Sequence, residues 1–90
     1  MITDKICKQL IINYISEIML DYGADLKEKD VIAICDYAYD WYEPYRQFSL
    51  WQITKTIMHF VIEKGVKPQD LEKHQEEMNN YIFGENLWHI

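Results

Sequence analysis

Glycine and proline are scarce in this chain of 90 residues, which contains three glycines and two prolines. A sandwich or barrel of short strands needs a turn about every 8 to 12 residues, and such turns are rich in both residue types. Their scarcity argues against the all-β classes. By contrast, 49% of the residues are hydrophobic and 14% are aromatic, which is enough apolar surface to offset the entropy lost on folding. We expect one folded domain over residues 1–90, because so short a chain rarely divides into two cores.

Basic residues are also few, since nine Lys and Arg stand against 15 Asp and Glu, for a net charge of −6. Nucleic acids and anionic membranes attract clustered Lys and Arg, so this composition disfavours direct binding to either. The sequence has no apolar run of about 20 residues and no basic region of a secretory signal near its start. We therefore expect a cytoplasmic protein that stays out of membranes, with Cys7 and Cys35 as reduced core residues.

The glycines and prolines divide the chain into segments with helical periodicity. Apolar residues recur at spacings of three and four over residues 4–22, and Gly23 follows where a helix usually stops. A second helix is predicted over residues 25–43, just before a proline. Its expected start is a capping box, in which Asp25 and Glu28 each accept a bond from the other's backbone.

The third predicted helix has the strongest start signal in the chain. Ser49 and Gln52 form a capping box, while Phe48 and Ile53 stand at the two positions of a hydrophobic staple. Both devices name Ser49 as the N-cap. The helix is expected to stop before Gly65, which again follows a periodic apolar segment.

A weaker fourth helix is predicted to begin at Pro68 and to end at Gly84, before an apolar tail over residues 85–90. Its apolar stripe is narrow and consists of Leu71, Met78 and Ile82. Short connections favour antiparallel neighbours. The sequence therefore predicts an all-α fold, a compact antiparallel bundle of three strong helices, one weaker C-terminal helix and an apolar tail.

The second predicted helix is unusually dense in acidic and aromatic side chains. Asp36, Asp40 and Glu43 share one side of it, opposite the apolar side. Like charges at these spacings destabilise a helix by about 0.2–0.5 kcal/mol per pair, so helix stability does not explain why they are present. Aromatic rings beside them are typical of protein contact surfaces. We therefore predict a partner-binding face made of Asp36, Asp40, Glu43, Tyr39, Trp41 and Tyr45.

A purely structural interpretation stays open. In it the rings pack in the core, and Arg46 or Lys55 neutralises the acids within the fold. A second acidic group in the fourth helix, comprising Asp70, Glu72, Glu76 and Glu77, has the same two interpretations. It would mimic phosphate charge only if it shared a surface with the acids of the second helix, and spacing does not decide this.

The sequence gives little support for catalytic activity or for a metal or cofactor site. Ser49 is used as a cap, neither cysteine has an adjacent histidine, and three isolated glycines cannot form a phosphate loop. The spacings of the usual zinc and di-iron motifs are missing too. We expect no catalytic residues, no metal and no cofactor.

The sequence thus favours a small acidic, non-enzymatic protein that binds and inhibits or regulates a larger protein with a basic surface, such as a nucleic-acid-binding protein. In composition only, it resembles the small inhibitors carried by phages and mobile elements. The alternative is a structural or regulatory subunit that forms a homodimer through its apolar surplus and its tail. The tail residues Leu87, Trp88 and Ile90 either make that contact or fold back on the core.

Overall fold

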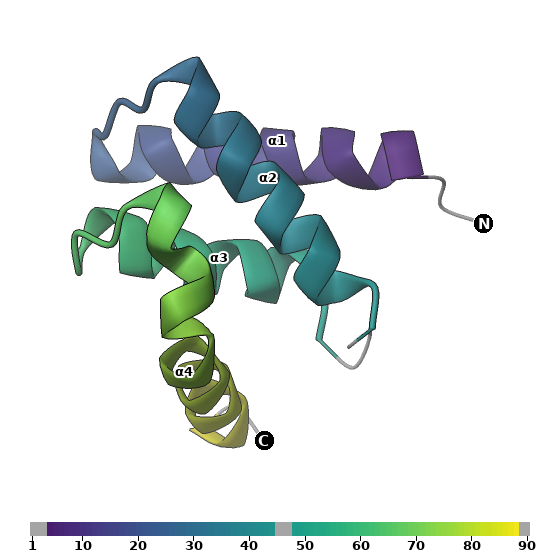
Figure 1. Cartoon of the computed structure of the whole chain (residues 1–90), viewed down its shortest axis with the longest axis vertical. Coiled ribbons are helices and arrows are strands. Elements are labelled where there is room, and N and C mark those ends of the chain that lie inside the picture. The colour runs from purple at the N-terminus through teal and green to yellow at the C-terminus, as the bar shows by residue number, and fades with distance from the viewer. Residues whose placement is uncertain (1–3, 45–47, 89–90) are drawn as a thin grey trace.

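The structure is a computed structural model that describes residues 4–44 and 48–88, with side chains described as far as residue 84. Within these residues every regular element is a helix, so the predicted all-α class is confirmed. The elements are α1 (Asp4–Tyr22), α2 (Glu28–Tyr42), α3 (Leu50–Ile62), the 3₁₀ helix η1 (Pro68–His74) and α4 (Gln75–Trp88). Figure 1 shows α2 lying diagonally across α1, with α4 at the opposite end of the molecule from α1.

Helix α1 has the predicted bounds. Its apolar stripe is buried through Cys7, Ile11, Ile15 and Ile18. Gly23 adopts a φ of +63°, and the N–H of the next residue donates to the Met19 carbonyl at 2.9 Å. A glycine in the left-handed conformation, followed by a bond that spans five residues, is the Schellman motif that commonly ends a helix.

The predicted start of α2 is wrong. The helix begins at Glu28, its N-cap is Lys27, and no side chain caps it. Leu26 packs against the core. Burial of this side chain keeps the chain extended for longer than the capping box of Asp25 would allow, and tertiary packing outweighs a local signal worth about 1 kcal/mol.

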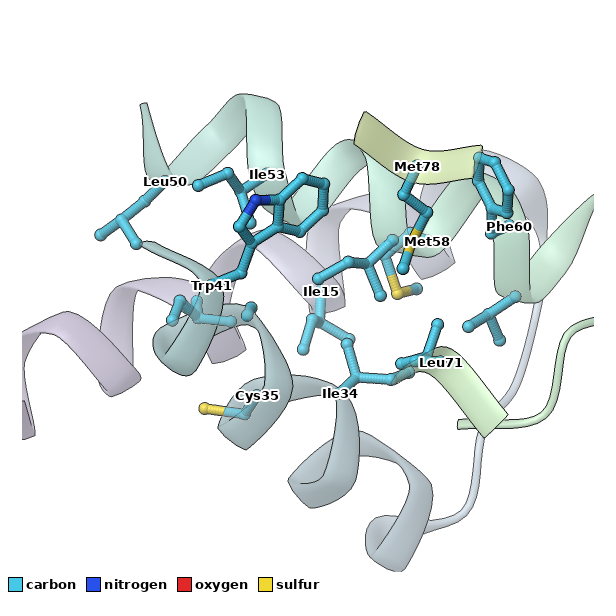
Figure 2. Packing of buried hydrophobic residues seen from close by; sticks show 14 of the residues in the cluster. Ile15, Ile34, Cys35, Trp41, Leu50, Ile53, Met58, Phe60, Leu71 and Met78 are labelled. Atoms are coloured by element: carbon cyan, nitrogen blue, oxygen red, sulfur yellow. The ribbon is translucent and has the colours of Figure 1, made fainter. Parts of the chain in front are cut away.

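Helix α3 starts as predicted. The Gln52 N–H donates to Ser49 Oγ at 3.1 Å, and the Ser49 N–H donates to Gln52 Oε1 at 2.9 Å. Phe48 and Ile53 of the staple are both buried. Because α3 packs against α1, α2 and α4, it is the central helix of the core. Figure 2 shows side chains of the other elements converging on it.

The fourth helical segment differs from the prediction at both ends. Pro68 opens a 3₁₀ helix instead of an α-helix, and α4 continues through Gly84 to Trp88. Glycine inside a helix costs about 1 kcal/mol, which does not by itself end a helix. The predicted stripe of Leu71, Met78 and Ile82 is confirmed as buried. None of the helices described has both the length and the apolar character needed to cross a membrane.

Candidate functional site

The acidic face of α2, which we define as Asp36, Asp40 and Glu43, is exposed to solvent. On the opposite side of the helix the periodicity correctly predicted the burial of Ile34, Cys35 and Ala38. One turn before Asp36, Ile32 lies on the same side and is 49% exposed. The acidic face therefore offers three carboxylates and one apolar side chain along a single side of the helix.

Helix α1 borders one edge of the acidic face. Lys8 Nζ lies 3.5 Å from Asp36 Oδ1, in a pair of half-exposed side chains. The same ammonium lies 5.3 Å from the centroid of the Tyr39 ring. Sequence reasoning missed Lys8, because it assigned neutralisation to Arg46 or Lys55. No pattern within one helix indicates a contact between two helices.

Tyr39 is tied to the start of α1, because its hydroxyl donates a hydrogen bond to Asp4 Oδ1. This bond raises the pKa of Tyr39 to about 12, and desolvation and the nearby charges of Asp4 and Glu43 add to the effect. The ring is half-buried and stays neutral at ordinary pH. It therefore fixes one border of the acidic face.

The other edge of the acidic face borders an open groove of about 370 Å³ between α2 and the segment that contains η1 and α4. We call it the α2–η1 groove, and it is lined by Tyr37, Asp40, Trp41, Glu72 and Gln75. Acids of the second and fourth helical segments thus do share a surface, through Asp40 and Glu72. The linear sequence left this point open.

Hydrogen bonds fix the walls of the α2–η1 groove. The Tyr37 hydroxyl donates to Gln75 Oε1, and Gln75 Nε2 donates to Asn79 Oδ1 at 2.8 Å. Burial and the negative charge of Glu72 raise the pKa of Tyr37 to about 12. Tyr37 is therefore a neutral donor that joins α2 to α4.

The 3₁₀ helix is held against α2 by two further contacts. Gln69 Nε2 donates to Asp30 Oδ1 at 3.2 Å, and Leu71 is fully buried in the core. Sequence reasoning found Leu71 from the apolar stripe. It missed Gln69 and Gln75, because a single polar residue on a helix carries no signal of a contact across the fold.

Trp41 requires a correction, because it was expected to be an exposed anchor and is only 5% exposed. Its indole points towards Ile53 of α3 (Figure 2). Trp41 follows Ile34 and Ala38 at helical spacing, so its ring lies on the side of α2 that faces the core. Trp41 also lines the α2–η1 groove. Tyr45 lies outside the described residues.

The predicted tail lies at the limit of the structure. The backbone of Leu87 and Trp88 belongs to α4. Their side chains, and all of Ile90, lie outside the described residues. The two predicted roles of the tail stay predictions.

A second open groove, of about 320 Å³, lies between α1 and α3. We call it the α1–α3 groove, and it is lined by Ile18, Asp21, Tyr22, Trp51 and Lys55. Tyr22 and Trp51 are 47% and 37% exposed. The Trp51 ring stands edge-on to Tyr14, at 5.1 Å between centroids. This groove is more apolar than the acidic face, and its two charged residues have opposite signs.

Cysteine is the strongest nucleophile among the side chains of this chain, and both of its cysteines lie in the core. Cys7 and Cys35 are buried thiols, and no disulfide joins them. Burial raises the pKa of the Cys35 thiol, which favours the unreactive protonated form. Among the described residues, no three His, Cys, Asp or Glu side chains are placed to hold a metal ion.

The fold and the site define a small all-α protein with an acidic face and a negatively charged groove beside it. The chain matches no protein-family model, no curated protein and no solved structure. Its function is therefore inferred from the geometry of these surfaces.

Proposed function

We propose that this protein is a small acidic, non-enzymatic binding protein that inhibits or regulates a larger protein by covering a basic surface on it. The observation that carries the proposal is the exposure of Asp36, Asp40 and Glu43 along one side of α2. Lys8 offsets part of the charge of Asp36, and Lys or Arg side chains of a partner would further relieve the repulsion among these carboxylates. We further propose that the protein acts in the cytoplasm, where Cys7 and Cys35 stay reduced.

The proposed mechanism is steric and electrostatic. Basic groups of the partner pair with the three carboxylates, while Ile32 and the Tyr39 ring supply apolar contact. Trp41 supports the acidic face from the core and does not serve as the contact itself. Such an interface associates fast and weakens with salt, because screening acts on exposed charges. A nucleic-acid-binding protein fits this description, since its basic surface ordinarily faces phosphates.

The test is affinity capture from a lysate of the native host, with the tagged chain and two charge-reversed variants. Asp36→Lys with Asp40→Lys reverses the acidic face, and Glu17→Lys with Asp25→Lys is the matched control at exposed positions elsewhere. The proposal expects a basic protein that is retained by the wild type and the control, lost by the acidic-face variant and released at high salt. Equal retention by all three folded proteins would contradict it.

A second candidate function, a homodimeric structural or regulatory subunit, is favoured by the α1–α3 groove. Two copies related by a two-fold axis would bury Tyr22 and Trp51 and place Asp21 of each copy against Lys55 of the other. Light scattering during size exclusion at low micromolar concentration would then give the dimer mass. Asp21→Lys and Lys55→Asp would each dissociate the dimer, and mixing the two variants would restore it. If only deletion of residues 87–90 dissociates it, the tail makes the contact; a monomer throughout rejects this candidate.

A further inference from the structure

The α2–η1 groove differs from the rest of the acidic surface because it is concave and partly aromatic. We propose that it receives an arginine side chain of the basic partner, with the guanidinium between Asp40 and Glu72 and its flat face against the Tyr37 ring. This inference rests on the proposed function and names the chemistry that the partner must present.

The charge of the groove favours a cationic ligand over an anionic or apolar one. Asp40 and Glu72 come from different elements and face the same space, and no Lys or Arg is among the described residues that line it. Lys73, the neighbour of Glu72, lies 3.6 Å from Asp70 within η1. Burial, and after it the charge of Glu72, raises the pKa of Tyr37, as expected for a carboxylate on the same groove. An anion would meet like charge here, and an apolar ligand would strip water from two carboxylates without replacing it.

The lining favours arginine over lysine. A guanidinium is planar, weakly hydrated and able to stack on an aromatic ring while its edge donates to two carboxylates. An ammonium is a compact and strongly hydrated charge that gains less from a ring and an apolar wall. Gln75 Oε1, which accepts one bond from Tyr37, has a second lone pair for a further donor. The groove thus offers a ring face, two charges and an acceptor, which match the donors and the flat face of arginine.

The walls of the groove are formed before any ligand enters. Tyr37, Gln75 and Asn79 are linked by hydrogen bonds, and the bond from Gln69 to Asp30 holds η1 against α2. Binding therefore orders few protein side chains, and most of the entropic cost falls on the incoming arginine.

Two blocked heptapeptides of alternating glycine and a basic residue, one with arginine and one with lysine, test the inference. Each is titrated into the labelled protein at low salt and followed by ¹H–¹⁵N spectra, including the side-chain amide of Gln75. We expect the arginine peptide to bind about three- to fivefold more tightly, as an exposed ring contact allows. Glu72→Gln and Asp40→Asn, both at exposed positions, should each weaken the arginine peptide about fivefold and remove its advantage. Glu17→Gln on α1 is the matched control and should affect both peptides slightly and equally.

The outcomes separate this inference from the proposed function. If both peptides bind equally well, and Glu72→Gln acts no differently from Glu17→Gln while Asp36→Asn weakens both, the acidic face binds cations and the arginine site is refuted. If neither peptide shifts any resonance at low salt, both ideas fail together. An arginine preference that survives Glu72→Gln and Asp40→Asn would place the site elsewhere and also overturn the inference.

Discussion

Two threonines on the central helix α3 differ in a single hydrogen bond, and this difference predicts a stabilising substitution. Thr54 is 0% exposed, and none of the described residues offers its hydroxyl oxygen a hydrogen bond. Thr56 is buried to the same degree, but its hydroxyl donates to the Gln52 carbonyl at 2.8 Å. Valine has nearly the shape of threonine, with a methyl group in place of the hydroxyl. Thr54→Val and Thr56→Val are therefore the same chemical change in two settings.

The expected magnitudes follow from those settings. A buried hydroxyl without a partner costs about 1–3 kcal/mol, so Thr54→Val should raise the free energy of unfolding by about 1–2 kcal/mol. At Thr56 the same gain in apolar burial is offset by a lost hydrogen bond worth about 0.5–1.5 kcal/mol, which leaves a change near zero. For a domain of this size, each kcal/mol moves Tm by about 4–8 °C.

The assay is urea unfolding followed by circular dichroism, with thermal unfolding as a second measure. Both variants should unfold in one transition with the slope of the wild type, so that shifts of the midpoint report stability alone. If Thr54→Val is no more stable than the wild type, or no more stable than Thr56→Val, the Thr54 hydroxyl is satisfied in solution and the reasoning is refuted.

Two further predictions concern glycine and tyrosine. Gly23→Ala should lower the free energy of unfolding by about 1–2 kcal/mol, because φ is +63° at this position. Gly84→Ala should raise it by about 0.5–1 kcal/mol, because Gly84 lies within α4 and has open space for a methyl group. Urea unfolding that gives both changes the same sign would contradict this prediction. An ultraviolet titration should show Tyr37 and Tyr39 ionising near pH 12, and Asp4→Asn should return only Tyr39 towards its ordinary value of 10. Because the folded pKa is raised, the stability that these neutral rings contribute is complete below about pH 10 and is lost as pH rises through 12.

Most of the fold could be predicted because its signals are local and agree with one another. The Ser49 capping box and the Phe48 staple are defined within one turn, and α3 begins where both place it. The predictions failed where a local preference competed with packing. Asp25 is a good cap that the burial of Leu26 overrides, and Gly84 is a weak helix former that the buried neighbours Met78 and Ile82 hold within α4.

The candidate site could be predicted only in part. The periodicity of apolar residues along α2 was enough to predict that Asp36, Asp40 and Glu43 are exposed, since the helix has one buried side. The α2–η1 groove depends on how η1 packs against α2. Residue spacing along the chain therefore could not predict that Asp40 and Glu72 line the same groove. Lys8 was missed for the same reason, because its contact with Asp36 exists only once α1 and α2 have packed.

The two sides of α2 allow the proposed binding and the stability of the fold to be tested separately. Buried Ile34, Ala38 and Trp41 fix the rotation of the helix, so the acidic face cannot turn away from a partner. Asp40 repels Asp36 and Glu43 at helical spacing, so neutralising it removes about 0.2–0.5 kcal/mol of repulsion per pair. If Asp40 stabilises the fold, Asp40→Asn will lower the free energy of unfolding. If Asp40 serves binding, Asp40→Asn will leave the free energy of unfolding unchanged or raise it, while affinity for the partner falls. This combination is the usual sign of a residue that serves function at the expense of the fold.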